Sequence, residues 1–315
     1  MADGRSVTAN FLPSRKGGNN MYAIGIDIGG TQTKAVRVTP DGQVLEQTQL
    51  ETGDTDNAWQ VAIKDWVTHC ISEQGPTKHI GVSCPGIARP DGSGISWMTG
   101  RMQRVVDFDF TRHLQSQNHV PVLNDAMAAL LGEVWQGAAN GLENVVMLTL
   151  GTGVGGAIYT NGKLLKGHTG RAGHLGHITI NSSGPKDICN TSGSIEHAIG
   201  NYSIAERSDG RFTSTRQLVE AVTRDDVQAR EIWQTSIDQL AVALASIINV
   251  LDPQCIIIGG GVAQSGAALF KPLVNAMDHV EWRPTGQGVP IVAAQLGPWA
   301  GAIGAAFNAL KEGHA

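Results

Sequence analysis

Two short loops in the sequence combine glycine and threonine directly after an apolar strand. They read GIDIGGTQTK and LGTGVGG. Glycine lets the backbone approach a phosphate, its N–H groups then act as donors, and each threonine adds a hydroxyl that can bond a phosphate oxygen. The residues that we predict in these two loops to bind the nucleotide cofactor are Asp27, Gly29, Gly30, Thr31, Thr33, Gly151, Thr152, Gly153 and Gly155.

A third glycine cluster, Gly259-Gly260-Gly261, follows the apolar run CIIIG and precedes an apolar helix. It could be only a tight strand-to-helix turn, and either threonine loop alone could be a hairpin whose glycines need a positive φ. None of the three is a P-loop, because no Gly-Lys-Ser/Thr follows, and none is the dinucleotide fingerprint with its acidic residue after a second strand. Two threonine loops in one chain still favour phosphate binding over two coincidental hairpins.

Asn124 and Asp125 stand at the junction of the strand VPVLN and an alanine-rich helix. Aspartate is a favoured helix N-cap, which by itself would explain this residue. A carboxylate that lies between two phosphate loops along the chain could also take the proton from a hydroxyl that attacks a γ-phosphate. Asp125 is therefore the candidate catalytic residue.

Strands and helices alternate along the chain, which predicts an α/β fold. Residues 1–20 are polar and without periodicity, and we expect them to form a tail. Three β-branched runs after Met21 predict antiparallel strands, and residues 145–167 repeat that pattern, which suggests a duplicated α/β unit facing itself across a cleft. The other predicted strands are 79–84, 120–124, 255–261 and 289–296, and the predicted helices are 57–74, 110–117, 126–139, 229–251, one after Gly261, and 300–313.

The composition indicates a folded protein that acts on small molecules. Forty of the 315 residues are glycine without a three-residue period, and 41% are hydrophobic, which excludes collagen and a disordered chain. The net charge is -5 and no basic run exceeds Arg15-Lys16, so neither a nucleic-acid nor a membrane surface is expected. The four cysteines predict no disulfide framework, and without a signal-like N-terminus we expect a cytoplasmic protein.

Five segments in this order resemble the ROK family of sugar kinases and repressors, within the actin/hexokinase/Hsp70 ATPase superfamily. The resemblance covers about Tyr22 to Ala306 and rests on GIDIGGTQTK, SCPGI, LNDAMAALLGE, LGTGVGGAIYTNGKLLKG and IIIGGGVA. It implies a two-lobed actin-like ATPase fold of the ribonuclease H-like type, in which each lobe is a mixed sheet flanked by helices. We expect a small α/β domain at 21–124 plus 300–315 and a large α/β domain at 125–299.

By this resemblance Asp125 is the general base for the 6-hydroxyl of a sugar, and Asn124 holds a neighbouring hydroxyl. The glycine-threonine loops hold ATP and its Mg²⁺, and the nucleoside lies near Gly259 to Gly261. The segment GRAGHLGHITI corresponds to the family's sugar-binding stretch, and Glu196 to a carboxylate on the anomeric side of the sugar. The substrate-binding residues expected in this way are Pro85, Gly86, Arg101, Asn124, Asp125, His174, His177 and Glu196.

The sequence departs from the family pattern around a structural zinc. The family's Glu-x-Gly-His stretch begins here with His174 and ends with His177. In the family this last histidine joins three cysteines around zinc, and their positions hold Asp187, Cys189 and Ser194 here. Because a structural zinc needs four closed ligands of the nitrogen or sulfur type, we predict no tetrahedral zinc. A weak metal held by His177, Cys189 and Asp187 is the open alternative.

A further departure places Arg101 where the family commonly has an asparagine. Arg101 could be a solvated loop charge and His174 a neutral hydrogen-bonding substitute, which is the interpretation that we favour. Both could instead make the site more positive and suit a substrate with an acidic group.

These residues predict an ATP-dependent kinase for the 6-hydroxyl of a hexose, glucose-like or an N-acetylhexosamine, whose two lobes close around the sugar. The alternatives are a kinase for an acidic sugar and a non-catalytic, sugar-responsive ROK regulator without a DNA-binding domain, since the 20 residues before Met21 are too few for a helix-turn-helix. A structural ATPase of the Hsp70 or actin type is disfavoured by the sugar segment with His177 and Glu196. The expected partners are a monosaccharide, ATP and a second copy of the chain, with helix 229–251 as a dimer surface.

Overall fold

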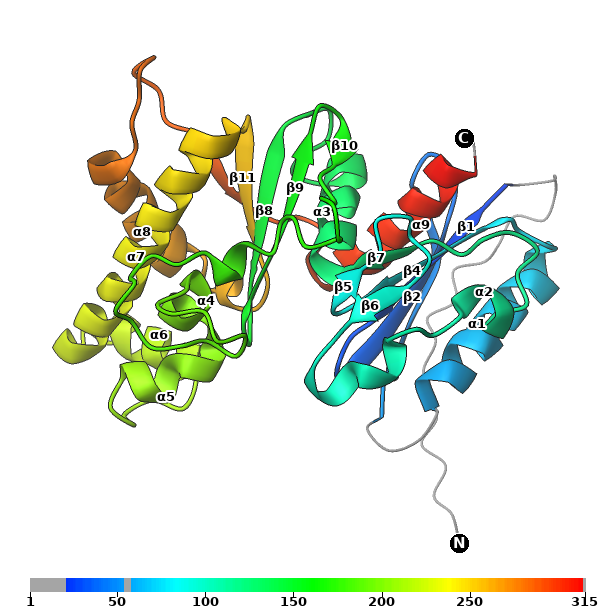
Figure 1. The fold of residues 1–315 in the computed structure, drawn as a ribbon, viewed down its shortest axis with the longest axis horizontal. Helices are drawn as coiled ribbons and strands as arrows, with labels where there is room; N and C mark the ends of the chain where they lie inside the picture. The colour runs from blue at the N-terminus through cyan, green and yellow to red at the C-terminus, as the bar shows by residue number, and fades with distance from the viewer. Residues whose placement is uncertain (1–20, 54–57, 314–315) are drawn as a thin grey trace, which may run out of the picture. The chain divides into compact units, whose positions relative to one another are not determined.

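The computed structural model describes residues 21–53 and 58–313, which form two compact units (Figure 1). Unit 1 holds the described residues up to Asp125 together with those from Gly301 onward, and unit 2 runs from Ala126 to Ala300. Each unit is built on its own five-stranded sheet. The tail that the sequence predicts at 1–20 lies outside the described residues.

The sheet of unit 1 begins with three antiparallel strands, as the sequence predicts, and continues with two strands parallel to the first. On one face Ile24 and Ile26 are buried in a core with Trp59 of α1 (Ala58–Gln74) and with α2 (Phe110–His113). In sheet order the strands are β3 (Val44–Glu51), β2 (Gln32–Val38), β1 (Ala23–Ile28), β4 (His79–Cys84) and β7 (Val122–Asn124).

Helix α9 (Ala300–Glu312) covers the other face of this sheet. Because side chains alternate along a strand, Gly25 and Asp27 face this helix and not the isoleucine core. A Cβ added to Gly25 would lie 1.8 Å from the carbonyl oxygen of Ala302, so only glycine allows α9 to pack this closely. The same packing brings the Asp27 carboxyl next to Gly301, at the start of the helix.

The sheet of unit 2 follows the same strand plan, with three antiparallel strands and two strands parallel to the first. The duplication suggested by the sequence is therefore visible in the topology. The predicted Asn161-Gly162 hairpin is present, and both residues have a left-handed φ, 49° and 73°. In sheet order the strands are β10 (Lys163–Leu164), β9 (Val154–Thr160), β8 (Val145–Leu150), β11 (Cys255–Gly259) and β12 (Ile291–Ala293).

Helices α7 (Val227–Leu251) and α8 (Ala267–Val280) share one hydrophobic core with this sheet. Trp233, Ile237 and Leu240 lie on the buried side of α7 at helical spacing. By length and composition α7 is apolar enough to cross a membrane, but half of that stretch is buried inside unit 2. Its apolar character is thus explained by the core that it covers.

Helix α3 (Asp125–Gln136) lies against the opposite face of the sheet, since a Cβ added to Gly155 of β9 would lie 3.5 Å from the Ala126 side chain. The far end of α3 is held by Glu133, which is fully buried. Its carboxylate accepts the backbone N–H of Gln295 at 2.9 Å, in the segment that follows β12. A buried carboxylate therefore fixes the helix to the end of the sheet.

The structure has short helices between 167 and 227, where the sequence predicts none. Ser194 and Ser214 accept backbone N–H bonds as N-caps of α4 (Ile195–Ile199) and α6 (Thr215–Thr223). Helix α2 ends at His113 and not at 117, as Gln115 adopts a left-handed φ of 52°. The remaining elements are β5 (Ile87–Ala88), β6 (Ile95–Trp97), η1 (Gly100–Val105), η2 (Leu175–His177), η3 (Asn201–Ser203), α5 (Ile204–Arg207), η4 (Val262–Ser265) and η5 (Gly297–Trp299).

Candidate active site

The first glycine-threonine turn connects β1 to β2 in unit 1. Gly29 N–H donates to the Gln32 carbonyl at 3.0 Å, and the Thr52 hydroxyl donates to the Gly29 carbonyl at 2.7 Å. Thr33 is fully buried, and its hydroxyl pairs with that of Thr52 at 3.1 Å. Thr33 therefore braces the turn and does not offer its hydroxyl to a phosphate, which corrects the prediction, whereas Thr31 is exposed.

Asp27 lies near the end of β1, and its Oδ1 accepts a hydrogen bond from the Ser83 hydroxyl at 2.7 Å. Burial raises the pKa of Asp27 to about 6; the Ser83 bond opposes this rise, and the negative charge of Asp125 adds to it. The two carboxylates of unit 1 thus lie close enough to repel each other.

Asn124 and Asp125 come at the end of β7 and the start of α3, as the sequence predicts. Asn124 is buried, and its side-chain amide donates to the Gly86 carbonyl at 2.9 Å. Gly86 follows Pro85 in a turn that requires glycine, because its φ is 104°. Asp125 is exposed. A carboxylate presented at a strand end in this way is accessible to a bound hydroxyl as a proton acceptor.

The second glycine-threonine turn connects β8 to β9 in unit 2, and a carboxylate braces it. Val154 N–H donates to Glu196 Oε2 at 2.9 Å. A Cβ added to Gly153 would lie 2.3 Å from the same oxygen, so Glu196 reaches the turn only because glycine is there. The backbone N–H groups of Asn201 and Tyr202 donate to two carbonyls of the turn, at 3.0 and 2.9 Å. Helix α4 and η3 thus support this turn from one side.

Three glycines in the predicted nucleotide turns are not explained by backbone conformation or by packing among the described residues. Of the eight glycines predicted to bind nucleotide, only Gly260 has a left-handed φ, 84°. A Cβ added to Gly30, Gly151 or Gly261 would meet no described atom within 4 Å. Neither backbone conformation nor packing within the described chain requires glycine at these three tips. The neighbouring Thr152 is exposed.

The predicted sugar-binding stretch packs on β9. A Cβ added to Gly176 of η2 would lie 2.0 Å from the Val154 carbonyl oxygen, so η2 touches the end of the second turn. His174 Nδ1 lies 3.1 Å from the Arg171 carbonyl oxygen, to which a protonated Nδ1 donates. This bond holds the His174 ring against the backbone of its own stretch. Arg101 lies in η1, but its side chain is outside the described part of the chain.

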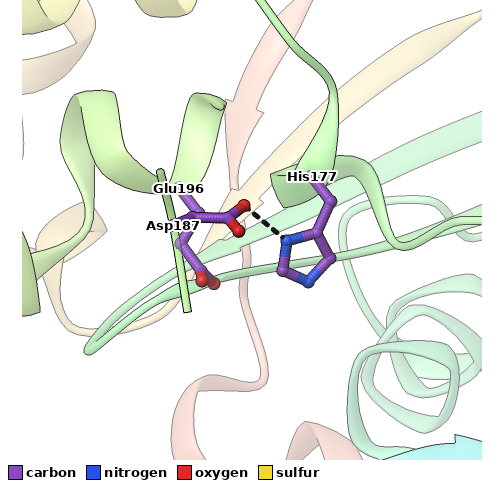
Figure 2. Close-up of side chains that lie close together, drawn as sticks. All are labelled: His177, Asp187 and Glu196. Carbon is purple, nitrogen blue, oxygen red and sulfur yellow. Dashed lines mark hydrogen bonds and ion pairs between the residues drawn. The ribbon is translucent and has the colours of Figure 1, made fainter. Parts of the chain in front are cut away.

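The side chains of His177, Asp187 and Glu196 point toward one another beside the second turn (Figure 2). Each offers one nitrogen or oxygen atom of the kind that can bind a metal, and these three atoms lie within 4.8 Å of one another. His177 Nδ1 is 2.8 Å from Asp187 Oδ2. Burial raises the pKa of Glu196; the Val154 N–H and His177 oppose the rise, and the charge of Asp187 adds to it. Glu196 Oε1 is buried without a hydrogen-bond partner among the described residues. A buried acceptor of this kind calls for a donor, such as a ligand hydroxyl.

Several side chains that position these groups are not indicated by the sequence motifs. Ser83 donates to Asp27, and Thr52 closes the first turn. Asp187 was considered only as a weak metal ligand together with Cys189, which is exposed and is not part of the three-residue cluster. A signal was available for Ser83, because it is a lone hydroxyl in the apolar run HIGVSC.

Comparisons with known proteins identify the family to which the chain is similar. The family model of the ROK family matches residues 23–312. The chain is 31% identical to a glucokinase of Thermotoga maritima, over 92% of this chain and 97% of that protein. It is 30% identical to an N-acetylmannosamine kinase of Escherichia fergusonii, over 93% and 99%.

Solved structures show the same fold. A ROK hexokinase from Thermus thermophilus superposes with a TM-score of 0.82 and 29% identity, covering 93% of this chain and 99% of that one. A ROK family glucokinase from Streptomyces griseus, solved in complex with glucose and AMPPNP, gives a TM-score of 0.74 and 27% identity, covering 92% and 99%. The predicted two-lobed, actin-like ATPase fold is confirmed by these neighbours.

Proposed function

The chain belongs to the ROK family, and we propose that it is an ATP-dependent kinase that phosphorylates the 6-hydroxyl of a neutral hexose, glucose-like or an N-acetylhexosamine. Its relatives include proteins named glucokinase and N-acetylmannosamine kinase. A structural neighbour was solved with glucose and an ATP analogue. These names support a sugar and a nucleoside triphosphate as the two substrates.

The observation that carries the sugar assignment is the Glu196 carboxylate. One oxygen braces the second turn through Val154 N–H, and the other is buried without a partner among the described residues. Leaving a buried acceptor unpaired costs about 1–3 kcal/mol, which a hydroxyl donor recovers. His177 offers a second polar group within 4.8 Å. A polyhydroxylated ligand supplies donors at this spacing.

Asp125 is the residue that we assign to proton transfer. The proton of the attacking hydroxyl passes to its carboxylate while the hydroxyl oxygen bonds to the γ-phosphorus and ADP leaves. The exposed position of Asp125, directly after the buried Asn124, supports this role. Asn124 positions the Pro85-Gly86 turn through its amide.

The nucleotide and its metal are assigned to the glycine turns and to Asp27. The open tips at Gly30, Gly151 and Gly261 support close approach of phosphates or nucleoside. When bound, Mg²⁺ would neutralise charge that develops on the transferred phosphoryl group. Asp27 fits this ion because it is a carboxylate whose negative charge is disfavoured by burial, so a nearby cation would stabilise it.

We also propose a cytoplasmic homodimer that binds neither nucleic acid nor membrane. The net charge of -5 supports the absence of a nucleic-acid surface. Val242 and Val250 on α7, 44% and 81% exposed, support a contact with a second copy of the chain. Light scattering of the purified protein tests the dimer, which a monomeric mass would reject.

A coupled ADP-release assay tests the kinase assignment. The panel is glucose, mannose, fructose, N-acetylglucosamine, N-acetylmannosamine and sugar acids, each with ATP and Mg²⁺, and phosphorus NMR identifies the product. We expect turnover with at least one neutral hexose and a 6-phosphate product. The Asp125→Asn protein, purified in the same way, controls for contaminating kinases. ADP release with sugar acids alone would support the acidic-sugar alternative, and sugar binding without any ADP release would support a regulator.

A further inference from the structure

The loop between η2 and α4 leaves the sugar stretch after His177 and returns at Ser194. Backbone bonds hold its two ends side by side. Ile195 N–H donates to the Ile178 carbonyl at 3.0 Å, and Thr179 and Ser194 form an antiparallel bridge. The ends of the loop are therefore fixed without any side chain, and the question is what fills its interior.

The interior of the loop is occupied by the Asp187 carboxylate, which has no exposed area. Its Oδ1 accepts the backbone N–H groups of Cys189 and Thr191, both at 2.9 Å, and its Oδ2 lies 2.8 Å from His177 Nδ1. The Ser194 hydroxyl is a fourth donor. Burial raises the pKa of Asp187, but these four donors outweigh burial and leave the pKa below its ordinary value. The carboxylate thus links His177, at the start of the loop, to three residues near its end.

This donor set does not fit the zinc that the family resemblance implies. A structural zinc requires four nitrogen or sulfur ligands with available lone pairs. His177 uses Nδ1 and Asp187 uses both oxygens in bonds within the protein, and Glu196 Oε2 is bonded to Val154 N–H. The exposed thiol of Cys189 lies outside the cluster. A metal would have to displace several of these hydrogen bonds.

We propose that the Asp187 carboxylate takes the place of a metal in this loop and is the residue that positions His177 for the sugar. Since Nδ1–H donates to Asp187, neutral His177 keeps its free lone pair on Nε2. The second ring nitrogen points away from both carboxylates (Figure 2). The closure of the loop stands by itself, whereas the sugar contact rests on the proposed kinase function.

The same geometry defines the class of substrate. When His177 is neutral, its Nε2 is a hydrogen-bond acceptor like Glu196 Oε1, so a ligand that contacts both must bring donors to both. Hydroxyl groups do this, whereas a ligand carboxylate would bring a second negative charge next to Glu196. The pair therefore selects a sugar that presents neutral hydroxyls at this position and disfavours an acidic group there.

The tautomer of His177 is the most direct test and needs no substrate. Long-range ¹H–¹⁵N spectra of the labelled protein at pH 8 distinguish the two neutral tautomers, and His177→Gln identifies the signal by its loss. We expect Nδ1–H in the natural protein. In Asp187→Asn the amide NH₂ can only donate to His177, so the tautomer should change to Nε2–H. An Nε2–H tautomer in the natural protein, or no change in the variant, overturns the proposal.

Steady-state kinetics of Asp187→Asn distinguish the positioning of His177 by Asp187 from general damage to the loop. In Asp187→Asn the amide oxygen still accepts the two backbone N–H groups, so the loop keeps its turn. We expect the KM for the sugar to rise about 10–100-fold, the range for loss of one charge-assisted hydrogen bond, with kcat and the KM for ATP within about 3-fold. Asp209→Asn, an exposed aspartate of unit 2, should change nothing. An unchanged sugar KM, or equal losses for both substrates, contradicts positioning. If no sugar is phosphorylated, the kinase assignment fails while the tautomer test still stands.

Chelation tests the replacement of the metal. We expect the purified protein to contain no stoichiometric zinc by mass spectrometry, and its melting temperature to stay within about 1 °C after dialysis against EDTA and after addition of one equivalent of Zn²⁺. Binding of a metal that fixes a fold raises stability by mass action. Stoichiometric zinc, or a drop in melting temperature of several degrees after chelation, overturns the proposal.

Discussion

The two glycine-threonine turns follow the first strand of sheets with the same strand order, yet they are held by different chemistry. The turn of unit 1 is closed by neutral hydroxyls, through Thr33, Thr52 and the Gly29 carbonyl. The turn of unit 2 is closed by a carboxylate, through Glu196 and Val154 N–H. Sequence similarity between the loops therefore does not extend to what supports them.

This difference separates two kinds of role. The braces of the first turn are buried and self-contained, so they set only the stability and shape of that turn. The brace of the second turn also carries the orphaned Oε1 that we assign to the sugar. A change at the second turn should consequently affect both substrates, whereas a change in the brace of the first should affect mainly stability.

Among changes at the two turns, the largest effect is expected from Gly153→Ala. The added Cβ would lie 2.3 Å from Glu196 Oε2, so the turn or the carboxylate must move. A displacement of about 1 Å in a positioned group can cost on the order of 10²-fold in rate, and we expect kcat/KM to fall by about that factor for sugar and for ATP. Steady-state kinetics with each substrate varied measure this. Gly151→Ala is the matched control, because a Cβ there would meet open space, and it should raise only the KM for ATP. Equal effects of the two variants would contradict the role of Glu196 in supporting the second turn.

Glu196→Gln should affect the sugar more than ATP. The amide keeps one oxygen for Val154 N–H but replaces a charged acceptor by an NH₂ donor at the orphaned position. Loss of a charge-assisted hydrogen bond is worth about 1.5–3 kcal/mol, so kcat/KM for the sugar should fall about 10–100-fold. Glu206→Gln, at a 63% exposed side chain of the same unit, is the control and should leave kinetics unchanged. A normal sugar kcat/KM in Glu196→Gln would remove the basis of the sugar assignment.

Asp27→Asn should stabilise the ligand-free protein above about pH 6. The folded pKa of Asp27 is raised to about 6, so the folded form holds a proton that the unfolded form has already lost. The free energy of unfolding therefore falls as the pH rises from the ordinary pKa of an aspartate toward 6, and this loss of stability persists at higher pH. Because Asp27 is only partly buried, we expect the variant to gain about 1–2 kcal/mol of unfolding free energy at pH 8, a gain that disappears near pH 4. Its turnover should be reduced. Denaturant unfolding at both pH values measures it, and a gain that is equal at both would contradict the assigned cause.

Thr33→Val is expected to have the smallest functional effect. It removes the buried bond to Thr52 while keeping the shape of the side chain, which should cost about 1 kcal/mol of unfolding free energy. Its KM for ATP should stay normal, as the hydroxyl is not available to a phosphate. The exposed Thr31→Val should do the reverse, with unchanged stability and a raised KM for ATP. A raised KM for ATP in Thr33→Val would restore the role that the sequence predicted.

Sequence patterns predicted the ends of several strands correctly. Asn124-Asp125 and the glycine turns lie at strand ends, because apolar runs followed by glycine or aspartate define those ends. The phosphate contact predicted for Thr33 does not agree with its burial. Gln32 is exposed and Thr33 is buried, which is the alternation expected along a strand. The alternation along the strand, and not the glycine-threonine motif, predicts which of these side chains is exposed.

Contacts that depend on tertiary structure could not be predicted in the same way. Asp187 accepts donors from His177 and from its own loop, and only the folded path of residues 178–195 brings them together. Helices α4 and α6 are short, and packing against α7 holds them in place, so their sequences carry little independent signal. The support of a site is thus harder to predict than the residues that perform its chemistry.

Turnover of Asp125→Asn measures the central claim most directly. The amide keeps the size of the side chain but cannot accept a proton at neutral pH, so we expect kcat to fall about 10²–10⁴-fold with sugar affinity, measured by calorimetry, within about 3-fold. Asp107→Asn, at a 70% exposed aspartate of unit 1, serves as the matched control and should retain full activity. A kcat near normal in Asp125→Asn would contradict its role as the base and with it the proposed mechanism.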